Sequence, residues 1–465
     1  MVYNGWQMGP AIQLSAESPE PLYRQLYSHL KSQILSGHLP DGSRIPATRE
    51  LCATLGINRT TVSAAYDLLE KDGLIRGHVG RGSFVQNPPK PDTSTISFAS
   101  SKPAADLFPV KEIQKLLASP QFSTNFEVLL QLGSPFGFAP LRSFLRNKAN
   151  DDVLITSGCQ QALDLLQRAF VQPGDLVFTE DPVYPGLREV FHRGGARLIG
   201  LPLAENGLDL NALEFELRRE RPRLLLVTPD FQNPTGTTLP LQARRELLRI
   251  AQNAGVTVVE NAIYRELRYT GAQLPSLREL DQTGTVLHLG SFSKIAFPGL
   301  RVGWIFGNEE AIRRLAEAKQ WCDLHTDQLS QALLLEFARS GMLENHLRHM
   351  IEAGRERLAA AVSAAGQFPL GTRFTRPEGG MSLWVTLPAG IEASRLLNEA
   401  TAQGVTFLPG SAFSISRRHD SSFRLSFAGL APARIQQGMS ILSKIAARLA
   451  EAAPAPEYSQ LTAIV

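Results

Sequence analysis

The chain has 465 residues, of which 43% are hydrophobic and 20% are charged, and its formal net charge is +3. This length exceeds what one hydrophobic core usually organises, so two or more domains are expected, and the composition excludes a disordered or a fibrous protein. A net charge this small neither identifies nor excludes a nucleic-acid-binding protein.

Three cysteines, Cys52, Cys159 and Cys322, lie far apart in the chain and show no paired spacing. This argues against a disulfide framework and against a zinc site, and it favours a reducing compartment. The first ten residues lack the pattern of a secretory leader, and no run approaches the roughly 18 apolar residues of a membrane span. We therefore expect a cytoplasmic protein with no metal site and no membrane contact.

The first predicted elements are helices. Residues 21–36 place leucines and an isoleucine on one helical face, and Gly37 follows. A short helix is expected at residues 48–55, ended by Gly56, and Asn58 is a suitable cap for the next one. Two short helices joined by a glycine turn indicate a helix-turn-helix.

A hairpin is expected after these helices. Residues 74–76 and 83–85 flank a glycine-rich basic tip at residues 77–82, which is typical of a wing. The exposed start of the second short helix, with Arg59 and Thr60, would then enter a DNA major groove. Any small helical bundle with a hairpin shows the same pattern, so the pattern alone leaves DNA binding open.

The exact amino-acid sequence of this region is more specific than its pattern of predicted helices and strands. Residues 45–51 read IPATREL, residues 55–62 read LGINRTTV and residues 80–85 read GRGSFV. In these segments the module resembles the winged helix-turn-helix domains of GntR-type regulators. The resemblance implies contacts with double-stranded DNA by Arg49, Arg59, Thr60, Thr61 and Arg81. For Arg49 the alternative is a salt bridge within the module, for example with Asp67.

A proline-rich polar stretch at residues 86–95 cannot hold a helix or a central strand, and it reads as a linker. We expect a DNA-binding domain at residues 15–86, a linker at 87–97, a second domain at 98–450 and a flexible tail at 451–465.

Apolar runs and amphipathic stretches alternate in the second domain. The runs at residues 224–227 and 256–259 are separated by an amphipathic stretch at 241–253. Such alternation predicts an α/β fold with a mainly parallel sheet, whose ligands bind at the carboxyl ends of the strands.

Lys294 stands in a set of groups that suits a phosphorylated aldehyde. It follows Ser291 and Ser293, and Arg301 comes shortly after. An amine can form a Schiff base, while hydroxyls and a guanidinium can bind a phosphate. A lysine beside a polar surface loop is the alternative, and for this fragment alone it would be preferred.

Three further fragments strengthen the first interpretation. Residues 156–163 follow an apolar run and open a helix, whose backbone amides can hold a phosphate. Tyr184 stands in a rigid turn and can stack on a pyridine ring. Asn233 stands in an Asn-Pro-Thr-Gly turn, where its amide can bind a phenolic oxygen.

From about Phe98 onwards the chain resembles fold-type I aminotransferases, with a smaller C-terminal α+β subdomain, and the whole is similar to the MocR family of regulators. The resemblance implies pyridoxal 5′-phosphate as cofactor, with Lys294 as the Schiff-base lysine and Arg424 on a ligand carboxylate. The implied cofactor-binding residues are Gly158, Cys159, Gln160, Tyr184, Asn233, Asn261, Tyr264, Ser291, Ser293, Lys294 and Arg301. For Arg424 a structural pairing with a nearby acid is the alternative.

The chain departs from the family pattern at Asn261. The family places an aspartate there, against the pyridine nitrogen, to keep that nitrogen protonated. A neutral amide cannot supply this charge. Glu260 is a poor substitute, because adjacent strand residues point to opposite faces.

We therefore expect a pyridoxal-phosphate-dependent transcription regulator that senses an amino compound, or the cofactor itself, with little or no transaminase activity. The alternatives are a working aminotransferase with an accessory DNA-binding module, and a DNA-binding protein whose large domain is only a scaffold. The resemblance also implies a homodimer. The sequence identifies neither the operator nor the effector.

Overall fold

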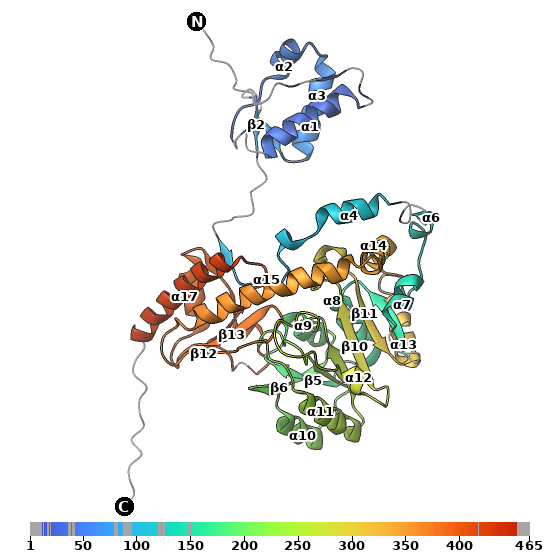
Figure 1. Ribbon diagram of the computed structural model, residues 1–465, viewed down its shortest axis with the longest axis vertical. Helices are drawn as coiled ribbons and strands as arrows, with labels where there is room; N and C mark the ends of the chain where they lie inside the picture. The colour runs from blue at the N-terminus through green and yellow to red at the C-terminus, as the bar shows by residue number, and fades with distance from the viewer. Residues whose placement is uncertain are drawn as a thin grey trace, which may run out of the picture. The chain divides into compact units, whose positions relative to one another are not determined.

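The computed structural model describes residues 12, 14–15, 18, 20–35, 39, 42–78, 82–86, 95–119, 122, 126–146, 151–416 and 418–452 (Figure 1). The chain divides after Ser94 into two compact units, which are described separately. No helix in these ranges is long and apolar enough to cross a membrane.

The first unit is a winged helix-turn-helix. Its helices are α1 (Leu22–Leu35), α2 (Thr48–Leu55) and α3 (Arg59–Lys71), and its strands β1 (Ile75–His78) and β2 (Gly82–Val85) pair in antiparallel fashion. The predicted helices and the hairpin are thus present, but the strands are longer at the tip than predicted, since Gly77, His78 and Gly82 belong to them. The core consists of side chains from all these elements, namely Leu26, Leu30, Ile34, Leu51, Val62, Ala65, Tyr66, Leu69, Ile75 and Val85.

Two local signals set the ends of the short helices. Gly56 has a φ of +64°, in the left-handed region that ends α2 without a steric penalty. The side chain of Asn58 accepts a hydrogen bond from the Thr60 amide, so it caps the start of α3.

The second unit contains a sheet of eight strands in the order β4-β11-β10-β9-β8-β5-β6-β7. The four central pairings, from β10 to β6, are parallel, whereas β11 is antiparallel to both its neighbours and β7 to β6. The strands are β4 (Asp152–Thr156), β5 (Leu176–Asp181), β6 (Arg197–Ala204), β7 (Gly207–Leu208), β8 (Leu224–Val227), β9 (Thr257–Asn261), β10 (Val286–Ser291) and β11 (Gly303–Gly307).

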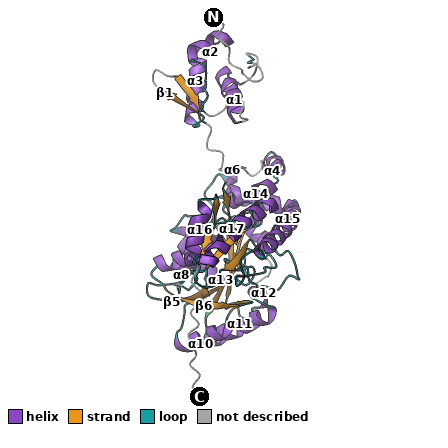
Figure 2. Ribbon diagram, turned by 90° about the vertical axis from the view of Figure 1, so that its left-hand side faces the viewer, coloured by secondary structure: helices purple, strands orange, loops and turns teal. Residues whose placement is uncertain are grey.

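Helices cover both faces of this sheet because its central strands are apolar on both sides. Leu224 and Leu226 of β8 pack with α8, α9 and α13, whereas Leu225 and Val227 pack with α10 and α11 (Figure 2). The bounds of these helices are α8 (Cys159–Phe170), α9 (Pro185–Arg193), α10 (Leu210–Arg219), α11 (Leu241–Ala254) and α13 (Glu309–Gln320). The expected mainly parallel α/β fold is confirmed.

A smaller subdomain is built on a second sheet, in the order β12-β13-β16-β15, and on long C-terminal helices. Its elements are α15 (Met342–Ala365), β12 (Arg373–Phe374), β13 (Ser382–Thr386), α16 (Ala393–Thr401), β14 (Val405–Thr406), β15 (Leu408–Pro409), β16 (Ser422–Ser426) and α17 (Pro432–Ala452). The remaining helices of the unit are η1 (Ala105–Leu107), α4 (Val110–Leu117), α6 (Phe126–Leu129), α7 (Ala139–Leu145), α12 (Leu277–Leu280), η2 (Pro298–Leu300), α14 (Gln328–Arg339) and η3 (Gly410–Ala412).

The last residues of the expected linker are part of the second unit. Ile96 and Ser97 form β3, which pairs in parallel with β14, and Ile96 is buried. The expected tail overlaps α17 by two residues, and residues 453–465 lie outside the described ranges.

Candidate functional site

A cavity of about 460 Å³ lies at the carboxyl ends of β4, β5, β8, β9 and β10. This is where ligands of an open α/β sheet bind. Eleven of the residues singled out in the sequence line it, namely Cys159, Gln160, Tyr184, Asn233, Asn261, Tyr264, Ser291, Ser293, Lys294, Arg301 and Arg424. Gly158 directly precedes the first of them.

Lys294 extends into the cavity from the turn that follows β10. Its Nζ donates a hydrogen bond to the carbonyl oxygen of Ser101 at 2.6 Å and lies 5.8 Å from the ring centre of Tyr264. Burial, together with the positive charges of Arg424 and Arg301, lowers the pKa of the Lys294 amine to about 8. A larger fraction of this amine is therefore neutral, and nucleophilic, than of an ordinary lysine.

Arg301 and the start of α8 form a basic cradle. Arg301 adopts a φ of +53°, which is unfavourable for a residue with a side chain and is typical of functional sites. Its guanidinium donates to the Ser293 hydroxyl at 3.2 Å and to the Ser157 carbonyl at 3.3 Å. Gly158 has a φ of +80°, which residues with a side chain rarely adopt, and a Cβ atom there would also lie 2.6 Å from Arg301, so glycine is strongly favoured.

Two other predicted residues have partners that fix them beside this cradle. The Ser291 hydroxyl donates to the Val302 carbonyl at 3.2 Å and accepts from the Ser293 amide at 3.1 Å. The Gln160 amide group donates to the Gly186 carbonyl at 3.1 Å. These bonds rigidify the turn after β10 and the first turn of α8.

Tyr184 stands at the start of α9, with 38% of its surface exposed. Its hydroxyl donates to Oε1 of Gln160 at 3.3 Å. A Cβ at Gly186 would lie 2.4 Å from the ring, so the ring packs directly over the glycine backbone. This arrangement holds an aromatic face at the edge of the cavity.

Asn233, Tyr264 and Arg424 form a hydrogen-bonded chain on the other side of the cavity. Asn233 donates to the Tyr264 hydroxyl at 3.2 Å and accepts from Nη1 of Arg424 at 2.9 Å. Burial raises the pKa of Tyr264 to about 12, so the phenol keeps its proton. Nη2 of Arg424 donates to the Ala99 carbonyl, and its buried Nε has no partner in the described part of the chain.

Arg424 makes no ion pair with an acid among the described residues. Burial lowers the pKa of its guanidinium, and the side chain lies 4.9 Å over the ring of Phe413. A buried cation without an acidic partner is unusual, because burying a charge is costly unless it is compensated. This geometry favours a ligand carboxylate over a structural acid as its counter-ion.

Asn261 lines the cavity, and the side chain of its neighbour Glu260 points away from it. The Cys159 thiol donates to Oδ1 of Asn261 at 3.8 Å, and burial raises the pKa of that thiol to about 12. Glu260 accepts bonds from the amides of Leu277 and Arg278 and lies 2.9 Å from His288 Nδ1. The expectation that Glu260 faces away from Asn261 is thus confirmed.

Sequence reasoning missed one part of the cavity wall. Ala99, Ser100 and Ser101 line it, and two of their carbonyls accept hydrogen bonds from Lys294 and Arg424. Small residues that act through their backbone leave no signal in a sequence.

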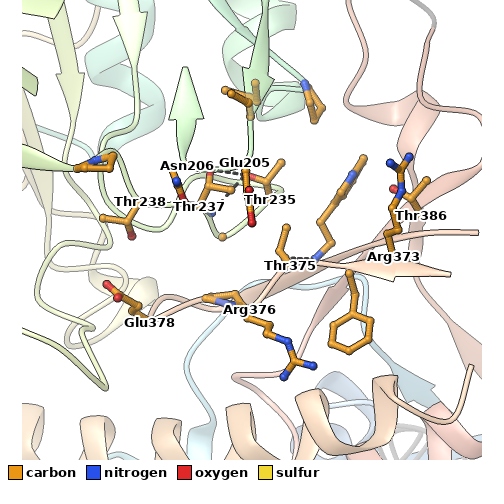
Figure 3. A pocket seen from close by; sticks show the side chains of 18 of the residues that line it. Glu205, Asn206, Thr235, Thr237, Thr238, Arg373, Thr375, Arg376, Glu378 and Thr386 are labelled. Atoms are coloured by element: carbon orange, nitrogen blue, oxygen red, sulfur yellow. Dashed lines mark hydrogen bonds between the residues drawn. The ribbon is translucent and has the colours of Figure 1, made fainter. Parts of the chain in front are cut away.

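A second and larger cavity, of about 1030 Å³, shares no lining residue with the first. Figure 3 shows it between a group of threonines that follows Asn233 and the segment that leads into β13. Thr235 and Thr237 bond to each other there, and Arg373, Arg376 and Glu378 lie exposed on the opposite side. None of the predicted site residues lines this cavity.

The first unit presents its predicted DNA contacts at the starts of two helices. Arg49 on α2 and Arg59 and Thr60 on α3 are exposed, and Thr61 is half-buried. Asn58 accepts bonds from both the amide and the hydroxyl of Thr60, which fixes the start of α3. Arg81 lies outside the described residues.

Two family models match the chain. Residues 106–442 match "Aminotransferase class I and II", and residues 22–85 match "Bacterial regulatory proteins, gntR family".

Curated relatives fall into two groups. The 2-aminoadipate transaminase of Thermus thermophilus is 41% identical over 75% of this chain and 89% of its own length. The HTH-type transcriptional regulator YisV of Bacillus subtilis is 30% identical over 94% of this chain and 98% of its own. The probable rhizopine catabolism regulatory protein MocR of Rhizobium meliloti is 29% identical over 92% and 94%.

Among solved structures, the second unit is similar to the α-aminoadipate aminotransferase LysN of Thermus thermophilus, determined with N-(5′-phosphopyridoxyl)-L-leucine. The two are 39% identical, with a TM-score of 0.74 over 77% of this chain and 94% of the other.

Proposed function

Because the chain belongs to the class I and II aminotransferase family and joins that domain to a gntR-family one, as the MocR-type regulators do, we propose that it is a transcription regulator controlled by an amino compound. The first unit binds DNA, and the second is of the pyridoxal-phosphate-dependent type.

The observation that carries the proposal is the meeting of three binding groups in one cavity. Arg301 and Ser293 suit a phosphate, Lys294 offers an amine of lowered pKa, and Arg424 is a buried cation without an acidic partner among the described residues. When bound, pyridoxal phosphate supplies an aldehyde carbon that a primary amine can attack.

The residues of the cavity would hold this cofactor in one orientation. The guanidinium of Arg301 and the amides at the start of α8 would bind the phosphate, as helix starts commonly do. The ring of Tyr184 would stack on the pyridine, and Asn233 with Tyr264 would bind the phenolic oxygen.

Arg424 suggests what the effector carries. A guanidinium binds a carboxylate through two parallel hydrogen bonds, and the reaction at the aldehyde requires a primary amine. An α-amino acid or an ω-amino acid of similar size satisfies both requirements.

The alternative, a working aminotransferase, is disfavoured by Asn261. By the resemblance to the family this residue would face the pyridine nitrogen, where a carboxylate would keep that nitrogen protonated, and Glu260 is held by partners of its own. We infer that the domain binds amines without converting them at ordinary enzyme rates.

The first test is the visible absorbance of the purified protein with added pyridoxal phosphate, compared between wild type and Lys294→Ala. We expect a band that requires Lys294 and that shifts when amino acids are added, without loss of the cofactor to its pyridoxamine form. If no Lys294-dependent band forms, the second unit is a scaffold, and the signal must be sought elsewhere.

We also propose a homodimer, on the basis of exposed apolar side chains in the second unit. Val128, Leu130, Leu132, Trp321 and Leu324 are 56% or more exposed. Gln328 donates to the carbonyls of Val128 and Gln131, so the first three lie next to the start of α14. Exposed apolar groups of this kind commonly mark a protein interface.

A further inference from the structure

Residues 95–101 connect the end of the linker to the cavity, and we call them the entry segment. The segment begins where the second unit begins, includes β3, continues through the fully buried Phe98 and ends in the cavity wall. Seven residues therefore separate the linker from the groups that bind a ligand.

The entry segment contacts two of the three cationic residues that line the cavity, Lys294 and Arg424, through its backbone. The Ser101 carbonyl accepts from Lys294 Nζ at 2.6 Å, and the Ala99 carbonyl accepts from Nη2 of Arg424. In the proposed site Lys294 would hold the cofactor aldehyde that a ligand amine attacks, and Arg424 would bind the ligand carboxylate.

A ligand carboxylate would compete directly with Ala99. Nη1 of Arg424 already donates to Asn233, which leaves the edge formed by Nε and Nη2 for a bidentate contact. On that edge Nε is buried without a partner in the described chain, while Nη2 is held by the Ala99 carbonyl. Because an unpaired buried donor is costly, a carboxylate that satisfies Nε is favoured there, and it meets the Ala99 oxygen.

A carboxylate at this position would displace the backbone at Ala99. The other end of the entry segment is packed too tightly to accommodate this displacement locally. The amides of Ile96 and Phe98 donate to the carbonyls of Gly404 and Thr406, and the Phe98 carbonyl accepts from the Ser426 amide. A Cβ at Gly438 of α17 would lie 2.6 Å from Phe98 and 2.9 Å from Ile96. In Figure 1, β3 is the light blue arrow beside α17.

We propose that the entry segment couples the cavity to the linker. A carboxylate on Arg424 takes the place of the Ala99 carbonyl, and the released segment loosens the pairing of β3 with β14, directly after the linker. This inference rests on the proposed function, because it requires a carboxylate ligand in the same cavity.

Hydrogen–deuterium exchange of the full-length protein tests the inference with two stable probes. N-(5′-phosphopyridoxyl)-L-leucine carries a phosphate, a ring and a carboxylate, whereas pyridoxamine 5′-phosphate lacks the carboxylate. We expect the first probe to speed exchange in peptides that cover residues 95–101 about tenfold, which corresponds to about 1.4 kcal/mol. The second probe should leave exchange in these peptides unchanged, and neither probe should change exchange in α10, which contributes no residue to the cavity.

A variant of Arg424 tests whether faster exchange arises from loss of its hydrogen bond to the Ala99 carbonyl. Arg424→Gln removes the bond to Ala99, so the entry segment should exchange faster without any probe. Phosphopyridoxyl-leucine should then cause no further increase in its exchange rate. Arg355→Gln is the matched control, because Arg355 also donates to a carbonyl, that of Tyr269, but outside the entry segment. Circular dichroism establishes whether each variant is folded. The comparison of the two probes on the wild-type protein does not depend on either variant.

Calorimetric titration of both probes keeps the two proposals distinct. If both bind and exchange in residues 95–101 does not differ between them, the coupling is wrong while the proposed cofactor site stands. If neither probe binds, the proposed function is wrong and the coupling falls with it.

Discussion

At the scale of single residues, the surroundings of Lys294 determine its chemistry more than its identity does. Burial and two neighbouring guanidinium groups lower its pKa from 10.5 to about 8. A lowered pKa means that the amine loses its proton earlier as the pH rises. At pH 7 about one amine in ten is then neutral, against roughly one in three thousand for an unperturbed lysine.

This shift predicts how the protein captures pyridoxal phosphate. The rate of capture should rise with pH to a midpoint near pH 8, which stopped-flow absorbance can measure. Arg424→Gln should move the midpoint upwards, because it removes a positive charge that opposes protonation of Lys294. A midpoint near that of free lysine in the wild type would contradict the assigned environment.

A second prediction concerns Asn261. In the proposed orientation of the cofactor, Asn261→Asp would place an anion against the pyridine nitrogen and should speed half-transamination with an amino acid at least about tenfold, or about 1.4 kcal/mol in activation free energy. Single-turnover absorbance measures the conversion to the pyridoxamine form. Asn261→Ala, which adds no charge, is the control and should give no increase. Equal rates in wild type and Asn261→Asp would show that another feature limits catalysis.

At the scale of elements, the start of α3 is fixed by its cap and exposes two predicted DNA contacts. Arg59→Ala and Arg49→Ala should each weaken binding to a mixed-sequence duplex and reduce the slope of log affinity against log salt by about 0.9 for each phosphate that the variant no longer neutralises. Fluorescence anisotropy at several salt concentrations measures both quantities. Arg218→Ala, which changes an exposed side chain of α10 in the second unit, is the control. An unchanged slope in Arg59→Ala would remove that residue from the interface.

The sequence predicts elements well where the determining signals are local. The bounds of α2 follow from residues 48–55 and the glycine that ends it, and most of the cofactor residues stand in short contiguous motifs. The entry segment is different, because its place depends on the pairing of β3 with β14 near the other end of the chain. Its contacts with Lys294 and Arg424 use carbonyl oxygens, which every residue carries.

At the scale of the whole molecule, the exposed apolar group near α14 predicts the assembly. Light scattering should give about twice the chain mass of 50.9 kDa. Leu132→Asp would place a charge in the proposed interface and should raise the dimer dissociation constant at least about tenfold, which corresponds to about 1.4 kcal/mol. Leu370→Asp is the control, since Leu370 is at least as exposed as Leu132 but lies after α15. A monomeric wild type would refute the dimer.

The pairing of β3 with β14 also has a consequence for how the protein is made. The winged unit is compact within residues 1–94, so it can fold as soon as it leaves the ribosome. The strand β3 follows directly but must wait for Val405 and Thr406, which takes on the order of tens of seconds at ordinary rates of translation. Each newly made molecule thus passes through an interval in which its DNA-binding part is complete before the part that controls it.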